Sequence, residues 1–359
     1  MARRLRERSP GTLIVFGGPQ VPDRAEGFLR ANPAVDLVCH GEGEATFARI
    51  LGHVADGDWS DVPGVSYLER GVFRHALPAP RLRDLAQVPS PYLEGVFDPL
   101  LEAYPELGWV LIWETNRGCP FTCTFCDWGS ATAGRVYRFD TDRLHAEIAW
   151  MAEKRIGFAI CCDANFGMLP RDVEITEAVV ASRNATGFPF SFSVQSAKNA
   201  TERVYRIQRL LHDNLNTIGA TISLQSANPE TLQAIRRQNI STESYRELQR
   251  RFAHDGVYTY TDLILALPGE PLATFREGIS AVIANGQHNH LQFHNCSILP
   301  NAEMGHPDYI ARYGMQTVPQ EIRHAHDRVD ARREVPEYLE TVIATDAPPP
   351  ADWVEEKVF

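Results

Sequence analysis

Short runs typical of β-strands alternate with segments of helical periodicity between residues 108 and 300, and no other feature limits the fold of this chain as strongly. Strands separated by helices usually pair in parallel and are connected by right-handed crossovers. The alternation therefore predicts an α/β fold, either a barrel or an open doubly wound sheet. The predicted strands lie at residues 109–116, 158–164, 188–196, 217–226, 258–269 and 290–300.

Polar residues recur at alternate positions of these runs, and this pattern favours an open barrel. Alternate side chains share one face of a strand. A closed barrel fills its interior with branched apolar residues, and a doubly wound sheet is apolar on both faces. The intervening helices disfavour an antiparallel sheet with one wet face. We therefore expect a partial six-stranded (β/α) barrel with room for a large polar ligand. Its polar face would carry Glu114, Asn116, Cys161, Asp163, Ser191, Ser193, Gln195, Thr221, Ser223, Gln225, Tyr260, Asp262, His290, Gln292 and His294.

Length, charge and hydropathy narrow the class of protein. A chain of 359 residues with 44% apolar content can bury one large core, as expected for an enzyme. The net charge of -11 disfavours a nucleic-acid partner, because such proteins usually carry a basic face. No apolar run suits a membrane span or a secretory signal, so we expect a cytoplasmic protein. Cytosolic thiols stay reduced, so clustered cysteines there indicate metal ligands or catalytic groups.

Three of the seven cysteines lie within eight residues, in NRGCPFTCTFCDWGSA (residues 116–131). A 4Fe–4S cluster usually takes four thiolates, so Cys119, Cys123 and Cys126 would leave one iron open for another ligand. A zinc site that borrows a histidine is the alternative. The remaining cysteines occur in apolar segments and are expected to be small buried hydrophobic residues; they are Cys39, Cys161, Cys162 and Cys296.

The spacing C-x3-C-x2-C directly after the first predicted strand, with aromatic Phe125 before the third cysteine, resembles the radical S-adenosylmethionine (SAM) superfamily. The resemblance covers roughly residues 108–300. It implies that the open iron of the cluster is chelated by the amino and carboxylate groups of SAM. An electron from the cluster then cleaves SAM to methionine and a 5'-deoxyadenosyl radical. It also implies an external reductant such as ferredoxin or flavodoxin.

The same resemblance nominates further ligand-binding residues. Asp163 and Asn165, in CDANFG, match the strand end that approaches the methionine amino group, although the family more commonly has Gly-Gly-Glu there. Gln225 and Ser226 match the ribose contact, and Gly269, in LILALPGEP, matches the segment that packs on adenine. For the polar residues, hydrogen bonding within the cavity wall is equally expected. His294 on the inward face is a candidate proton-transfer catalyst, with a hydrogen-bonded wall residue as the alternative.

Residues 1–55 resemble the C-terminal half of a Rossmann-like cobalamin-binding domain, through TLIVFGGPQ and VDLVCHGEGEATFARILG. The resemblance places Gly17, Gly18 and Gly43 beside cobalamin. Earlier βα units of that domain and an Asp-x-His-x-x-Gly motif are absent from the sequence, and two parallel strands make a poor sheet. We therefore expect a fragment, a mis-started product or a degenerate member. The short remnant argues against cobalamin binding, although cobalamin stays a candidate cofactor.

The remaining segments complete the expected organisation. Residues 56–107 are a linker with a hairpin at 64–75, residues 108–300 the barrel, and residues 301–359 a capping tail with a helix near 319–343 and a linker at APPPADW. Three histidines of the tail are metal-ligand candidates, although helix-surface positions are favoured: His306, His324 and His326.

These features together favour a radical SAM enzyme for cobalamin-dependent C-methylation of a small-molecule or natural-product substrate. Radical cyclisation or rearrangement without methyl transfer is the alternative within enzymes. Methylthiolation is disfavoured, because it needs a second three-cysteine cluster and Cys39 is the one cysteine upstream of the motif. A catalytically inactive iron–sulfur or zinc-binding protein is the alternative outside enzymes.

Overall fold

The computed structural model describes residues 1–128, 134–199, 201–322 and 337–358. Its N-terminal unit is a four-stranded sheet in the order β1-β2-β3-β4, in which β1 and β2 are parallel and the other pairs are antiparallel. The hairpin expected at residues 64–75 is confirmed, and it completes this sheet. The elements are α1 (Ala2–Arg8), β1 (Val15–Gly17), α2 (Glu26–Ala31), β2 (Leu37–Cys39), α3 (Gly43–Gly52), β3 (Val65–Glu69) and β4 (Val72–His75).

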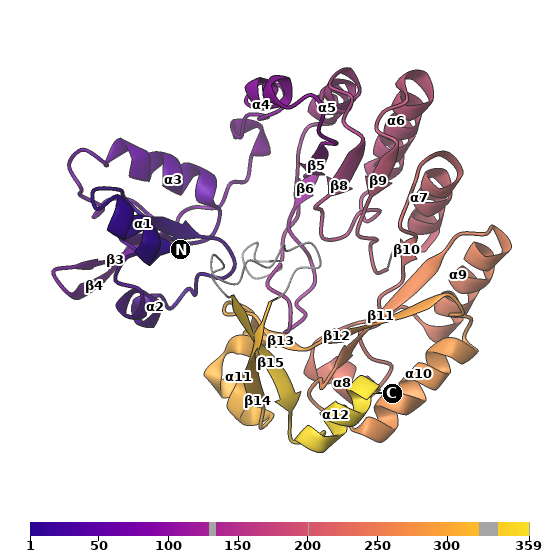
Figure 1. Ribbon diagram of the computed structural model, residues 1–359. Coiled ribbons are helices and arrows are strands. Elements are labelled where there is room, and N and C mark those ends of the chain that lie inside the picture. Colours follow the sequence, from indigo (N-terminus) through magenta and orange to yellow (C-terminus); the bar gives the residue numbers. More distant parts are fainter. Residues whose placement is uncertain (129–133, 200, 323–336, 359) are drawn as a thin grey trace.

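Two parallel sheets of three strands follow, in the orders β5-β8-β9 and β10-β11-β12. A parallel bridge between Ser191 and Asn216 joins β9 to the chain that leads into β10. The strands form an open arc with the connecting helices along its outer side (Figure 1). The strands are β5 (Val110–Trp113), β8 (Phe158–Cys161), β9 (Ser191–Ser193), β10 (Ala220–Thr221), β11 (Thr259–Leu265) and β12 (His290–Asn295). The helices are α5 (Thr141–Glu153), α6 (Arg171–Thr186), α7 (Thr201–Asn214), α8 (Pro229–Ala234), α9 (Thr242–His254) and α10 (Leu272–Ala284).

The core of the first sheet lies between its strands and the outer helices. The sequence predicts a helix over residues 140–154 with Asp140 or Thr141 as its cap. Helix α5 begins after Asp140, whose carboxylate accepts a hydrogen bond from the backbone N–H of Asp142. Its buried residues Leu144, Ile148 and Met151 recur at helical spacing and pack in one apolar cluster with Trp113. Short connecting elements precede or follow β5: η1 (Leu85–Gln87), α4 (Asp98–Ala103), β6 (Asn116–Arg117) and β7 (Tyr137–Arg138).

The strand register corrects part of the expected polar face. Trp113 lies opposite Cys161, so Cys161 faces the apolar core and does not share a face with Glu114. The open face of these strands includes Ile112, which is 65% exposed, so it is more apolar than predicted. A one-residue shift in strand register exchanges the two faces, and sequence alternation alone does not fix that shift.

The second sheet agrees with the prediction. Its register places Thr221, Tyr260 and His290 side by side, and Asp262 opposite Gln292. The apolar residues of the other face pack against the helices, in a cluster that includes Ala220, Leu263, Leu265, Leu248, Phe252, Phe275 and Ile279.

The C-terminal segment differs from the expectation. Its described part forms an antiparallel sheet in the order β13-β15-β14, so a helix across residues 319–343 is wrong for β14 and β15. The expected linker APPPADW is also wrong, since helix α12 begins at Pro350 and proline is tolerated in a first turn. The elements are β13 (Ser297–Ile298), η2 (Glu303–Gly305), α11 (Pro307–Arg312), β14 (Gln316–Glu321), β15 (Tyr338–Ala344) and α12 (Pro350–Val358). His324 and His326 lie outside the described residues.

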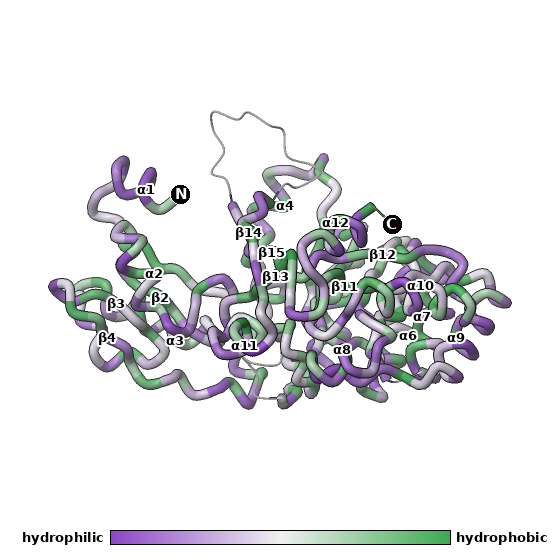
Figure 2. The backbone as a smooth tube through the Cα atoms, turned by 90° about the horizontal axis from the view of Figure 1, so that it is seen from below, coloured by the Kyte–Doolittle hydropathy of each residue, from purple (hydrophilic) through white to green (hydrophobic). Residues whose placement is uncertain are grey.

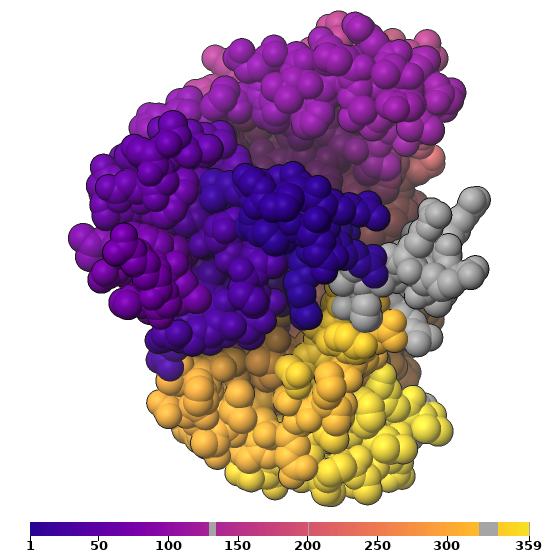
Figure 3. All heavy atoms as spheres, turned by 60° about the vertical axis from the view of Figure 1, so that its left-hand side comes forward, coloured from indigo at the N-terminus to yellow at the C-terminus, as the bar shows by residue number. Residues whose placement is uncertain are grey.

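Strands β13, β14 and β15 lie between the N-terminal unit and the two parallel sheets in two perpendicular views (Figures 1 and 2). In the space-filling view, the N-terminal residues lie against two other parts of the chain (Figure 3). One is the region that follows them in the sequence, and the other is the C-terminal segment. Asn301 makes part of that contact, because its amide donates to the carbonyl of Val21 at 2.9 Å and accepts from the N–H of Asp23 at 2.8 Å.

Candidate active site

The cysteine loop follows β6 and is fixed by backbone contacts from distant segments. Gly118, with φ of +116°, turns the chain into the loop, a conformation that glycine adopts without strain. Thr124 donates its N–H to the carbonyl of Ile235 at 3.0 Å and accepts from the N–H of Met304 at 2.8 Å. Cys119 and Cys123 are buried and Cys126 is half-buried. The loop therefore holds its thiols in a sheltered position.

Two cations lie beside these thiols, and the sequence analysis missed both. Lys198 Nζ lies 3.9 Å from Cys123 Sγ. Arg237 is 4% exposed, donates to Asn239 at 3.0 Å and to the carbonyl of Ser223, and its Nη1 has no hydrogen-bonding partner among the described residues. Burial lowers the pKa of both cations, and attraction to the thiols opposes that effect. Such cations favour thiolates and an anionic ligand.

Asn165 contacts the loop directly. Its side-chain amide donates to Cys119 Sγ at 3.2 Å, and the residue is 1% exposed. Its Oδ1 is buried and has no partner in the described part of the chain. A buried acceptor of this kind is costly unless a donor reaches it, so it fits a ligand that carries N–H groups.

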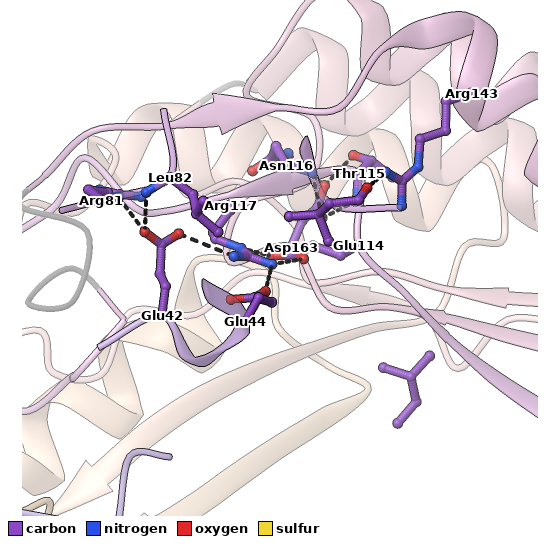
Figure 4. A network of polar contacts seen from close by, with 12 residues as sticks. Glu42, Glu44, Arg81, Leu82, Glu114, Thr115, Asn116, Arg117, Arg143 and Asp163 are labelled. Atoms are coloured by element: carbon purple, nitrogen blue, oxygen red, sulfur yellow. Dashed lines mark hydrogen bonds and ion pairs between the residues drawn. The ribbon is translucent and has the colours of Figure 1, made fainter. Parts of the chain in front are cut away.

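Asp163 holds the strand that leads into the loop (Figure 4). Its carboxylate accepts from the N–H of Thr115 at 2.8 Å, from the N–H of Asn116 at 3.1 Å, from Asn116 Nδ2 at 2.6 Å and from the Thr115 hydroxyl. Burial raises the pKa of Asp163 to about 6, although these hydrogen bonds oppose the shift. The Asp163 carboxylate is therefore hydrogen-bonded within the protein, and it does not line the cavity described below.

The three residues nominated for ribose and adenine lie on two neighbouring strand ends. Gln225 adopts φ of +69° and lines the cavity described below. The Ser226 hydroxyl donates to the buried Glu270, so it is engaged within the chain. Gly269 adopts φ of +75°, and its carbonyl accepts from Asn228 Nδ2 and Thr231 Oγ1. Phe125 packs, partly buried, on the apolar cluster of the C-terminal segment.

A cavity of about 200 Å³ opens beside the cations, between the ends of β9, β10 and β11. It brings together residues that are far apart in the sequence, and half of its polar lining residues belong to the predicted polar face. Its polar lining includes Gln195, Ser196, Lys198, Thr201, Thr221, Ser223, Gln225, Arg237, Asn239 and Asp262.

His294 pairs with Asp262, which also lines this cavity. His294 Nε2 lies 3.2 Å from Asp262 Oδ1, and its side chain is 45% exposed. Burial raises the pKa of Asp262, but hydrogen bonds from His294 and Ser223 outweigh it, so the pKa lies below its usual value. Asp262 therefore stays ionised and orients the imidazole, which leaves His294 exposed on the open face.

The glycines nominated for cobalamin contact lie in turns of the N-terminal unit. Gly18 has φ of +94°, and an added Cβ at Gly18 or Gly43 would meet no atom within 4 Å. A Cβ at Gly17 would lie 3.5 Å from the Cys39 carbonyl oxygen, so Gly17 sits in close strand contact. The two turns therefore present open backbone, as an extended cofactor face requires, but they supply few side-chain contacts.

By their positions, no three His, Cys, Asp or Glu side chains in the described ranges converge on a single metal ion. A cluster distributes its thiolates over separate irons, so its ligands need not converge in this way.

His306 caps α11, and its Nε2 lies 2.8 Å from Arg24 Nη2. Among the described residues, no helix is long and apolar enough to cross a membrane.

Residues 113–281 match the family described as the Radical SAM superfamily. The chain is 43% identical over 359 residues to the 2-(S-pantetheinyl)-carbapenam-3-carboxylate methyltransferase of Streptantibioticus cattleyicolor, an alignment that covers 99% of this chain and 52% of that protein. It is 42% identical over 364 residues to the cobalamin-dependent radical SAM methyltransferase TokK of Streptomyces tokunonensis, covering 100% and 53%. The chain thus spans about half the length of these relatives.

A solved structure shows the same fold. It is the radical SAM methyltransferase TsrM from Kitasatospora setae with tryptophan substrate and a SAM analogue bound, with a TM-score of 0.69 and 16% identity. The match covers 99% of this chain and 72% of that chain. Residues 113–281 of this chain therefore match the Radical SAM superfamily, and its whole length is similar to about half of two methyltransferases, one of which is named as cobalamin-dependent and radical SAM.

Proposed function

We propose that this chain holds a 4Fe–4S cluster on Cys119, Cys123 and Cys126 and binds SAM in the adjoining cavity, for cobalamin-dependent C-methylation of a small-molecule or natural-product substrate. The observation that carries the proposal is the meeting of three sheltered thiols with two cations, the buried Arg237 and the half-buried Lys198, at a polar cavity. When bound, the cluster and SAM supply the reducing electron and the 5'-deoxyadenosyl radical that removes an unactivated hydrogen. The protein's own side chains would bind, orient and shelter these groups.

The barrel is the scaffold of this proposal. We infer that β5, β8, β9, β10, β11 and β12 act as one partial barrel over residues 108–300, with the bridge between Ser191 and Asn216 as the join. Residues 1–55 would be the remnant of a Rossmann-like domain, and residues 301–359 a cap. Residues 56–107 would connect that domain to the barrel, although their hairpin β3–β4 also completes the N-terminal sheet. Parallel strands place their carboxyl ends at one edge, where ligands of α/β folds bind.

The residues around the cavity suit the parts of SAM. Arg237 and Lys198 would bind the carboxylate, because a guanidinium and an ammonium are the natural partners of that group. The Oδ1 of Asn165, buried without a partner among the described residues, would accept from the amino group. Asp163 would act behind it as a positioning residue, because its carboxylate holds Thr115 and Asn116.

The nucleoside would lie along the next strand ends. Gln225 would contact the ribose, with Ser226 as a positioning residue behind it through its hydrogen bond to Glu270. The backbone at Gly269 would approach the adenine, since glycine leaves room for a flat ring. Phe125, between the second and third cysteines, would shield the cluster from solvent on the side of the C-terminal segment.

The open face beyond the cavity is proposed as the substrate site. His294, oriented by Asp262, would take up or deliver a proton to the substrate. The apolar side of the same face, at Ile112, suits the carbon skeleton of a small or natural-product substrate. An external reductant such as ferredoxin or flavodoxin would supply the electron.

Cobalamin would lie along the open turns at Gly17, Gly18 and Gly43. Because the two turns offer few side-chain partners, we expect weak cobalamin binding by the residues of this chain alone. The support for cobalamin comes from the similarity to the cobalamin-dependent relative along the whole chain.

Metal content tests the cluster site directly. After anaerobic reconstitution, the wild-type chain should hold about four irons with matching sulfide. Single Cys119→Ala, Cys123→Ala and Cys126→Ala variants should lose them, whereas a Cys39→Ala variant should keep them. One zinc ion per chain in place of iron would overturn the proposal.

The fate of the methyl group separates the two radical reactions. With SAM carrying a deuterated methyl group, a methylated product should gain the label by mass spectrometry of a panel of candidate substrates. A modified product without the label would instead assign radical cyclisation or rearrangement.

A further inference from the structure

We propose that Arg117 is a positioning residue that couples the N-terminal unit to the cysteine loop, with Glu42 and Glu44 of the N-terminal unit as the groups that hold it. The inference rests on the proposed cluster site, because it assigns a role to a residue two positions before Cys119. It adds that the N-terminal unit helps to fix the geometry of the loop, whatever ligand that unit binds.

Arg117 binds carboxylates from two parts of the chain (Figure 4). Its Nε donates to Glu114 at 3.0 Å and its Nη2 to the other oxygen of Glu114 at 2.9 Å, a two-point contact. Its Nη1 lies 3.2 Å from Glu42, and its Nη2 lies 2.8 Å from Glu44. Glu42 and Glu44 stand at the start of α3, so this guanidinium bridges the N-terminal sheet unit and the barrel.

The contact is sheltered from solvent. The side chains of Arg117 and Glu42 are 17% and 12% exposed, and Glu42 also accepts from the N–H of Leu82 at 2.9 Å. The hydrogen bond to Glu114 raises the pKa of Arg117, so the guanidinium keeps its charge. Charged hydrogen bonds in such a setting are stronger and more directional than exposed ion pairs.

The strand leading to the loop is thus held from two sides. Asp163 holds Thr115 and Asn116 from the barrel, and the N-terminal unit holds Arg117 (Figure 4). Gly118, which has a positive φ, directly precedes Cys119. The orientation of this turn therefore depends on the contacts that its neighbouring residues make. A displacement of α3 would therefore reach Cys119 through two residues.

The same helix start also adjoins the turn with open backbone. Gly43 is the first residue of α3, and Glu42 precedes it. A ligand that contacts this turn would act on the residues that hold Arg117. Coupling of this kind is reciprocal, so occupation of the N-terminal unit and order in the cysteine loop should strengthen each other.

Hydrogen exchange of the metal-free chain is the direct test. In a Glu42→Gln/Glu44→Gln double variant, amides of residues 114–123 should exchange about tenfold faster than in the wild type, because Arg117 loses both of its charged partners in the N-terminal unit. A Glu69→Gln variant is the matched control, since it removes an exposed ion pair with Arg74 in the same unit. Unchanged exchange in a folded double variant would overturn the inference.

Cluster loss provides a second readout. Iron should leave the reconstituted double variant about tenfold faster than the wild type when a chelator is added. An Arg117→Lys variant should lose iron at an intermediate rate, because lysine keeps the positive charge but cannot make the two-point contact of a guanidinium. If the double variant does not fold, the single Glu44→Gln variant takes its place, with an effect of about threefold. Unchanged chelator rates would overturn this inference alone, whereas a wild-type chain that binds no cluster would overturn the proposed function and this inference with it.

Discussion

At the scale of single residues, the charge around the cysteine loop decides what the site can bind. Three thiolates are anionic ligands, and a cluster that carries them needs nearby cations or donors. Lys198, Arg237 and Asn165 meet that need from three separate segments. Two of them also keep unused bonding capacity within the described residues, at Arg237 Nη1 and Asn165 Oδ1. A donor and an acceptor of this kind support the proposal that the site binds a second ligand with both a carboxylate and an amino group.

Replacing Arg237 should weaken SAM binding. We expect an Arg237→Gln variant of the reconstituted protein to bind SAM at least tenfold more weakly by isothermal titration calorimetry, because a buried charged hydrogen bond contributes about 1.5 to 3 kcal/mol. An Arg250→Gln variant, which removes an exposed ion pair with Glu247, should bind as the wild type does. Equal SAM affinity of the two variants would show that Arg237 does not take part in SAM binding.

The cysteines could be predicted from the sequence, but their neighbours could not. The spacing of Cys119, Cys123 and Cys126 is a local pattern. Lys198 and Arg237 reach the same place only because β9 and β10 end at one edge of the fold, and neither residue belongs to a pattern of its own. Asn165 was predicted for its strand position, whereas the hydrogen bond to Cys119 required the structure.

At the scale of elements, the C-terminal helix α12 supports the strand end beside the proposed nucleoside site. Glu356 Oε2 accepts from the N–H of Ala266 at 3.1 Å, and Ala266 has φ of +55°, which is uncommon for alanine. Burial raises the pKa of Glu356 to about 7, with the charges of Glu270 and Asp352 adding to the effect. This helix is thus joined to the segment that contains Gly269.

The raised pKa of Glu356 gives a signed pH dependence. Its folded pKa of about 7 exceeds the ordinary value of 4.5, so the native state retains the proton that the unfolded state releases. The free energy of unfolding should therefore fall as pH rises from about 4.5 to about 7, by roughly 2 to 3 kcal/mol.

Urea unfolding at the two ends of this pH range measures that decline. A Glu356→Gln variant should show a smaller decline than the wild type, and the buried Glu270, whose pKa is also raised, would account for part of what remains. A decline of equal size in both proteins would show that Glu356 does not titrate in this window.

Helices and strands were predicted correctly where the periodic pattern was long. Predictions were wrong where the pattern was short or where they depended on the register of paired strands. The helical pattern of α5 and its cap at Asp140 are confirmed. The segment around β14 and β15 was predicted as helix, although its strands stabilise each other only through pairing that sequence periodicity does not reveal. The face of Cys161 depended on the register against Trp113, which is a tertiary property.

At the scale of the whole molecule, the N-terminal unit contacts the chain near both ends of the open arc of strands. Glu42 and Glu44 reach Arg117 beside β5, and the loop at Val21 and Asp23 reaches Asn301 after β12. These contacts join residues that are 75 and 278 positions apart, so no local pattern could predict them.

Loss of the Asn301 contact should loosen this arrangement. We expect an Asn301→Ala variant to be cleaved three- to tenfold faster by trypsin in residues 53–107, because each lost hydrogen bond contributes about 0.5 to 1.5 kcal/mol. Asn285→Ala, which removes an exposed contact with Arg246 in the helical layer, serves as the control. If Asn301→Ala and Asn285→Ala are cleaved at the same rate, Asn301 does not hold the N-terminal unit in place.

The central claim is that the cysteine loop and its cavity cleave SAM reductively. The most direct measurement is 5'-deoxyadenosine by mass spectrometry after anaerobic reconstitution and addition of dithionite and SAM, for the wild type, Cys123→Ala and, as a control, the buried Cys296→Ala. We predict 5'-deoxyadenosine from the wild type and from Cys296→Ala, and none from Cys123→Ala. A wild-type chain that holds its full cluster and forms no 5'-deoxyadenosine would contradict the account.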